Sequence, residues 1–91
     1  IAYCKSFSTQ VTLAANTRTD FGITIAADEG YKYMGIANID YSGSSSHLAI
    51  GKWSVGGNTC YISMQNLNNS QTNVTVTINA MFIKSDCLRN N

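Results

Sequence analysis

The stretch TNVTVTINAMFIK, residues 72–84, predicts the central strand of the fold. Side chains alternate between the two faces of an extended strand. Apolar side chains take one face of this stretch, namely Val74, Val76, Ile78, Ala80 and Phe82, while threonine and asparagine take the other. The β-branched content favours a pleated, half-buried surface. A strand of this kind needs partners, which the rest of the chain has to supply.

Further extended segments precede it, spaced about 10 residues apart. They are residues 10–14, 19–27, 31–41, 47–55 and 59–65, with residues 2–8 as either an edge strand or a connector. Asn16, Gly30 and the run Gly56-Gly57-Asn58 are typical turn residues, and Gly35 favours a bulge at which residues 31–41 change their facing. No segment has a helical period. The sequence therefore predicts an all-β fold, an antiparallel β-sandwich or jelly-roll-like barrel of six to seven strands.

A chain of 91 residues predicts a single domain, residues 1–91, with a thin core. Because the chain starts at Ile1, we expect it to be the C-terminal part of a longer polypeptide. Residues 85–91 are expected to be a frayed tail.

Only 12% of the residues are charged, and the formal net charge is +1. Without a cluster of lysine and arginine there is no electrostatic case for a nucleic-acid partner. No apolar run approaches the roughly 20 residues that a membrane-spanning helix needs, so we expect no membrane insertion. A surface rich in serine, threonine and asparagine is typical of extracellular and virion proteins.

The chain has three cysteines, Cys4, Cys60 and Cys87. In a secreted domain one thiol would be left over, and a pair between Cys4 and Cys87 would join the two ends of the chain. In a reducing compartment all three would be free thiols that pack as small apolar side chains. The phase that Cys60 shares with Ile62 and Met64 favours the second interpretation. No CxxC motif and no second histidine support a zinc site.

Catalytic patterns are missing from the sequence. His47 is the single histidine, and no GxSxG turn presents a serine nucleophile to it. Acidic pairs spaced for glycoside hydrolysis are also missing. Asp28 and Glu29 are adjacent in a turn, and we expect the other acidic side chains to be exposed to solvent. We expect a non-enzymatic protein without catalytic residues, metal or cofactor.

Aromatic side chains are the main candidates for binding. Trp53 and Tyr61 flank the Gly56-Gly57-Asn58 turn at similar distances, so a hairpin could bring them together on one face as a platform for a sugar ring. Asn58, Gln65 and Asn66 would then be available for hydroxyl groups. The alternative, favoured by the phase that Trp53 shares with Val55, is that Trp53 packs in the core or at a subunit interface.

Several segments together resemble a known family. They are Gly30-Tyr31-Lys32-Tyr33-Met34-Gly35-Ile36, a Ser/Gly loop, a strand bearing tryptophan, Val74-Thr75-Val76-Thr77-Ile78 and Met81-Phe82-Ile83-Lys84. Over residues 20–85 the chain resembles the C-terminal tip domains of phage tail fibres and receptor-binding proteins, with Tyr33 where that pattern has proline. The resemblance implies a β-sandwich homotrimer at the tail tip of the virion. It also implies contact with other tail proteins and binding to a saccharide or protein on the bacterial surface.

Two alternatives remain open. The chain could be a structural trimeric cap or virion decoration domain that binds no host ligand. It could also be the carbohydrate-binding module of a secreted bacterial protein, which would be a monomer.

Overall fold

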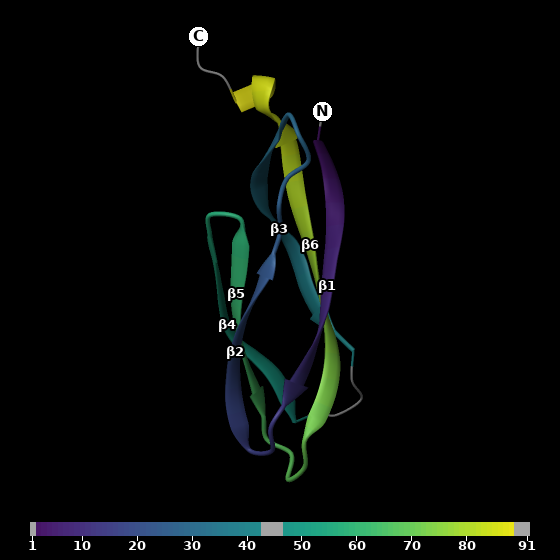
Figure 1. Ribbon diagram of the computed structural model, residues 1–91, viewed down its shortest axis with the longest axis vertical. Helices are drawn as coiled ribbons and strands as arrows, with labels where there is room; N and C mark the ends of the chain where they lie inside the picture. Colours follow the sequence, from purple (N-terminus) through teal and green to yellow (C-terminus); the bar gives the residue numbers. More distant parts are fainter. Residues whose placement is uncertain (1, 43–46, 89–91) are drawn as a thin grey trace.

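The computed structural model describes residues 2–42 and 47–88, and the side chains of residues 2–42 and 47–86. It contains six β-strands and one turn of 3-10 helix, as Figure 1 shows. The elements are β1 (Ala2–Leu13), β2 (Thr17–Thr24), β3 (Tyr31–Tyr41), β4 (Leu48–Gly56), β5 (Thr59–Asn66), β6 (Thr72–Lys84) and η1 (Ser85–Leu88). The predicted all-β class is confirmed, as a sandwich and not as a closed barrel.

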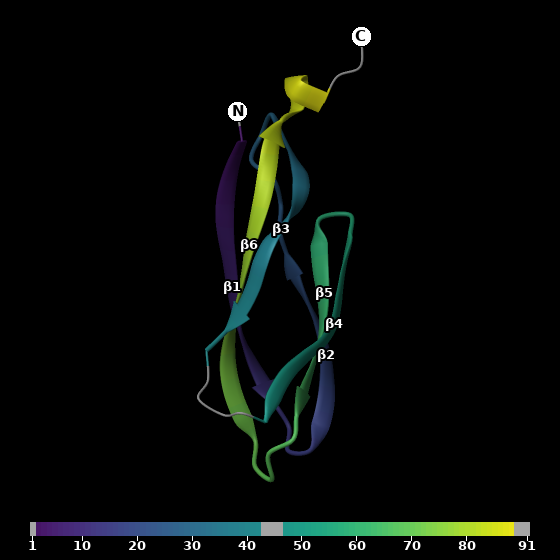
Figure 2. The ribbon, with the colours of Figure 1, turned by 180° about the vertical axis from the view of Figure 1, so that it is seen from behind.

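The strands form two antiparallel sheets of three strands each (Figures 1 and 2). Sheet A has the order β1-β6-β3, and sheet B has the order β2-β5-β4. The chain changes sheet after every strand except β4, which a two-residue turn joins to β5 as a hairpin. β6 is the central strand of sheet A, with the bounds that the sequence predicts.

The core is a single apolar layer between the two sheets. β6 contributes its predicted apolar face to the core. The five side chains of that face, from Val74 to Phe82, are all buried. Across from it, β5 contributes Cys60, Ile62 and Met64, each at most 2% exposed. Burying an aliphatic or aromatic side chain of this size stabilises the fold by about 1.5–3 kcal/mol. The two central strands therefore carry most of the energy that joins the sheets.

Asn66 closes one end of the sandwich and is fully buried. Its side-chain nitrogen lies 3.1–3.2 Å from the carbonyl oxygens of Leu13, Ala14 and Ser70. Its side-chain oxygen accepts a hydrogen bond from the backbone N–H of Asn68 at 2.9 Å. A buried amide is stable only when it is hydrogen-bonded. Asn66 thereby joins the end of β1 to the loop that follows β5.

Sheet A extends beyond sheet B at the opposite end, where residues 25–30 cover its inner face (Figure 1). Tyr3 packs there between Tyr31, at 4.8 Å between ring centroids, and Phe82, at 5.4 Å. Lys5 and Asp28 form an ion pair of 2.8 Å beside this cluster. The hydrogen bond from Lys5 lowers the pKa of the Asp28 carboxyl group. The covering segment is thus held by packing and by charge.

The two long sides of the sandwich differ. β1 packs beside β2 on one side, whereas β3 and β4 make little contact on the other, where an apolar groove separates them. The molecule measures 56 × 20 × 17 Å, and its radius of gyration of 15.3 Å exceeds the roughly 12 Å expected for a compact domain of this length. The fold is therefore a thin, elongated sandwich with one open side.

The sequence-based segments differ from the structure at several boundaries, and β2 begins at Thr17, two residues before the predicted start. Residues 2–8 and 10–14 belong to one long strand, β1, because β6 is long enough to pair with both. The strand predicted over 19–27 ends at Thr24, since Ile25 donates its N–H to Asn58 of the hairpin and leaves the sheet. Residues 85–88 form a 3-10 turn where a frayed tail was expected, and residues 89–91 lie outside the described part.

Cys60 agrees with the interpretation that the thiols pack as small apolar side chains, whereas the exposed Cys4 does not. Cys60 is buried and Cys4 is exposed, and both are free. Burial raises the pKa of the Cys60 thiol. The side chain of Cys87 lies outside the described part of the chain, and so does the suggested pair between Cys4 and Cys87.

We expect Asn66→Ala to lower the free energy of unfolding by about 2–3 kcal/mol, because buried carbonyl groups lose their donor. Chemical denaturation followed by tryptophan fluorescence would measure this. Gln65→Ala, at the exposed neighbouring position, should change the stability by less than about 0.5 kcal/mol. Equal stabilities of the two variants would contradict the role assigned to Asn66.

Candidate functional site

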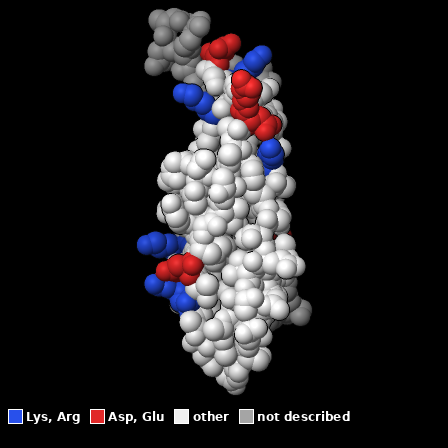
Figure 3. Space-filling view, viewed as in Figure 1, with Lys and Arg blue, Asp and Glu red and all other residues white. Residues whose placement is uncertain are grey.

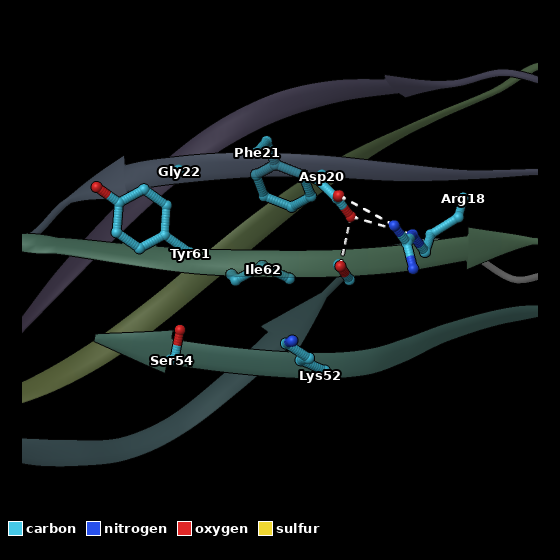
Figure 4. A pocket seen from close by; sticks show the side chains of 9 residues that line it. Arg18, Asp20, Phe21, Gly22, Lys52, Ser54, Tyr61 and Ile62 are labelled. Atoms are coloured by element: carbon cyan, nitrogen blue, oxygen red, sulfur yellow. Dashed lines mark hydrogen bonds and ion pairs between the residues drawn. The ribbon is translucent and has the colours of Figure 1, made fainter. Parts of the chain in front are cut away.

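The outer face of sheet B carries a shallow hollow of about 490 Å³. Antiparallel pairing places side chains of three strands in rows across it. One row consists of Asp20, Ser63 and Lys52, and the next consists of Gly22, Tyr61 and Ser54. Figure 4 shows these side chains on the same face, with Arg18 beside Asp20.

Tyr61 is the aromatic group of the hollow, and 54% of its surface is exposed. Its ring lies over two glycine positions on neighbouring strands. A Cβ atom on Gly22 would lie 3.5 Å from Cδ1 of the ring, and one on Gly56 would lie 3.6 Å from Cε2. Figure 4 shows the ring face-on, next to Gly22. Both distances are ordinary van der Waals contacts, so the ring packs closely against the backbone of both neighbouring strands while the residue stays 54% exposed.

Charged groups lie beside the ring. Nε and Nη2 of Arg18 each lie 3.3 Å from a carboxylate oxygen of Asp20. The hydroxyl group of Ser63 also donates a hydrogen bond to Asp20. Lys52 follows Ser63 in the same row, on β4, and no acceptor for it was found among the described residues. The hollow thus combines a flat aromatic surface with donors, one acceptor pair and a cation.

The outer face of sheet A is different, because its polar side chains bond to one another. Asn79 donates to Asn38 at 2.6 Å and accepts a hydrogen bond from Ser6. Ser8 and Thr77 share a hydrogen bond of 2.9 Å. Groups that already bond within the protein offer less to a ligand. Arg18, Asp20 and Ser63 on sheet B also bond to one another, so the outer face of sheet B is the better candidate because of the exposed Tyr61 ring and Lys52.

Trp53 and Tyr61, the predicted platform, lie on opposite faces of sheet B. Tyr61 pairs with Ser54 on the outer face, whereas Trp53 pairs with the buried Ile62. The prediction placed the centre of the hairpin at Gly57, but the turn contains two residues, Gly57 and Asn58, and its centre lies between them. A shift of one residue moves a side chain to the other face of a sheet. The expectation of a shared platform is therefore wrong.

The other three predicted site residues are also separated. Asn58 is exposed at the tip of the hairpin, where its carbonyl oxygen accepts from Ile25 at 2.7 Å. Gln65 is exposed on the same face as Tyr61 and pairs with Arg18. Asn66 is fully buried and bonded within the protein, so the expectation that it is available to a ligand is wrong.

Six residues of the hollow were not singled out from the sequence. They are Arg18, Asp20, Gly22, Lys52, Ser54 and Ser63. Alternation along residues 18–22 places the first three on one face, so this part of the signal was present. The side of Lys52 depends on a register shift between Ile50 and Lys52, which alternation does not reveal.

A second hollow, of about 550 Å³, is the groove between β3 and β4. Trp53 lies in it with 47% of its surface exposed, so it does not pack inside the core, and packing at a subunit interface stays a prediction. Ile36, Ile39 and Ile50 line the groove as well. Both bordering strands are irregular, with register shifts at Gly35, between Ile36 and Asn38, and between Ile50 and Lys52. The groove therefore exposes apolar side chains along an irregular edge.

The described residues contain no group of three or more His, Cys, Asp or Glu side chains that could hold a metal ion. None of the helices in this part of the chain is long and apolar enough to cross a bilayer. Comparison with protein-family models, with curated proteins and with solved structures returned no match.

Gly22→Ala should crowd the Thr59 side chain and place a methyl group against the Tyr61 ring, because the added Cβ would lie 3.0 Å from Thr59 Cγ2 and 3.5 Å from Cδ1 of the ring. We expect shifted ring resonances of Tyr61 in NMR spectra and a loss of about 1 kcal/mol in stability from crowding. Gly35→Ala is the matched control, since its Cβ meets no atom within 4 Å. Unchanged Tyr61 resonances in Gly22→Ala would show that the ring does not lie over this glycine.

Proposed function

We propose that the chain is a non-enzymatic attachment module that binds a saccharide on the outer face of sheet B. The observation that carries the proposal is the Tyr61 ring, which lies over Gly22 and Gly56 and leaves 54% of its surface to solvent. An aromatic ring that is open on one face stacks well against the C–H face of a sugar.

The surroundings of the ring suit a sugar better than an apolar ligand. Pyranose hydroxyl groups need both donors and acceptors. Ser54 and Lys52 supply donors within the hollow, and the oxygens of Ser63 and Asp20 keep lone pairs beyond those used in their own hydrogen bonds. The hollow is shallow and about 490 Å³ in volume, within the usual range of ligand sites. Its groups lie on paired strands, so their positions are held by the sheet and little ordering is needed on binding.

The biological setting within the proposal follows the resemblance described above. The chain would form the tip of a phage tail fibre in the virion and would assemble as a homotrimer with other tail proteins. There it would attach to a saccharide or a protein on the bacterial surface. The elongated shape, 56 Å long and about 20 Å wide, and the low content of charge, 12%, support this setting.

Tyr61→Ala should weaken saccharide binding at least about tenfold, because it removes the stacking surface. The measurement is a screen on an array of bacterial cell-wall and capsular saccharides, followed by titration calorimetry with the strongest hit. Tyr61→Phe keeps the ring and should bind nearly as well as the native protein. Trp53→Ala removes an aromatic ring of similar exposure from the opposite face and is the matched control. Binding that survives Tyr61→Ala, or an array without any hit, would overturn the proposal.

A second candidate function, a structural trimeric cap, is favoured by the groove between β3 and β4. Trp53 and three isoleucines expose apolar surface there, on the side where the two sheets make little contact. A second copy of the chain is the occupant that fits the trimer implied by the resemblance. Register shifts in both bordering strands disfavour simple pairing of edges, so copies would meet through side chains, with Trp53 as the anchor.

We expect light scattering on a sizing column to give the mass of three chains, with and without reductant, and Trp53→Ala to shift it toward one chain. Tyr61→Ala, on the outer face, should leave the mass unchanged. A trimer that binds no saccharide would favour the cap over the attachment module. A native monomer would instead favour a carbohydrate-binding module of a secreted protein and would overturn the trimer.

A further inference from the structure

The hollow around Tyr61 carries a net positive charge. Arg18 and Lys52 contribute two cations, and Asp20 contributes one anion. Figure 3 shows the charged side chains of that view in two separate groups, one of them over the region where Figure 1 places β2 and β4. The surface between the groups is uncharged. Exposed charges more than about 10 Å away are largely screened at ordinary salt. The charges of the other group therefore do not cancel the net positive charge of the hollow.

The carboxylate of Asp20 is already bonded within the protein. Arg18 contacts both of its oxygens at 3.3 Å, and Ser63 donates a further hydrogen bond to it. Lys52 does not share in this arrangement. Adjacent strands lie about 4.8 Å apart, so β2 and β4 are separated by about 10 Å with Ser63 between them. The side chains of Asp20 and Lys52 could therefore form an ion pair only by reaching toward each other across Ser63.

We propose that the bound saccharide carries an acidic group, a carboxylate or a phosphate, that pairs with Lys52. This inference rests on the proposed saccharide site and states which class of saccharide the site takes. The sugar ring stacks on Tyr61, and its acidic group lies over Ser63, toward Lys52. Tyr61 and Ser63 are two residues apart on β5, about 7 Å along the strand, so one acidic sugar residue can contact both.

Arg18 also lines the hollow and adds to its positive charge, but its Nε and Nη2 contact Asp20. Lys52 is therefore the cation that an acidic group over Ser63 would pair with. Charge-assisted hydrogen bonds from lysine to an anion are stronger than those between neutral groups. Since the site is open to solvent, the same bonds should weaken as salt is added.

The test measures the binding of three probes by titration calorimetry. They are oligogalacturonate, its neutral methyl ester and poly(glycerol phosphate), each at low and at physiological salt. We expect an acidic probe to bind more tightly than the ester and to lose affinity with salt. Preference for oligogalacturonate identifies a carboxylate as the recognised group, and preference for poly(glycerol phosphate) identifies a phosphate.

Lys52→Gln should weaken the acidic probe about tenfold and leave the ester within about twofold, whereas Lys52→Arg should retain most of the binding. Lys32→Gln, an exposed lysine on β3 in the other sheet, removes the same charge away from the hollow and should have no effect. Equal losses in the two glutamine variants would mean a general effect of net charge and would overturn the inference.

The remaining outcomes separate this inference from the proposed function. An ester that binds as well as the acid, with affinity that still depends on Tyr61, would overturn the acidic class and leave the saccharide site in place. Failure of all three probes, together with an array without any hit, would overturn both.

Discussion

The apolar layer that β5 and β6 share is the contact on which the other features of the structure depend. Each sheet has three strands, so only these two strands are paired on both sides, and the other four are edges. Ile62 and Met64 on one side, and Val76 and Ile78 on the other, fill the space between the sheets. A chain of this length buries only about 60–65% of its surface. Because the layer is filled by side chains, the hollows of the described residues lie on the outer faces and along the edges.

The two outer faces use their side chains differently. On sheet A, hydroxyl and amide groups form a ladder across the strands, for example from Asn79 to Asn38, and the face satisfies its own hydrogen bonds. On sheet B, the Tyr61 ring packs against both neighbouring strands, and Lys52 is separated from Asp20 by a whole strand. Among the described residues on the outer face of sheet B, Lys52 therefore has no acidic partner and the Tyr61 ring has an exposed surface. Both features are what a binding surface requires.

The edges explain why the molecule has one open side. On the side of β1, Lys5 points toward the core face and is held there by Asp28, and an inward charge of this kind discourages pairing with a foreign strand. On the other side, β3 and β4 carry register shifts and leave Trp53 half exposed between the sheets. The proposed attachment site and the proposed assembly groove thus lie on opposite faces of sheet B, and Lys52, on the edge strand, borders both.

The sequence by itself determined the class of the fold and its central strands, because a period of two along residues 72–84 and the phase of Cys60, Ile62 and Met64 are local properties of the chain. It also determined the left-handed turn at Asn16, whose φ is 51°, and the bulge at Gly35. Only the tertiary structure decided where the proposed binding surface lies. The length of the turn at Gly57 set the register that separates Trp53 from Tyr61, and the shift near Gly51 turned Lys52 outward. Asn66 became a buried structural group through carbonyls more than 50 residues away. Register and long-range hydrogen bonds arise between strands, so alternation within one strand does not contain them.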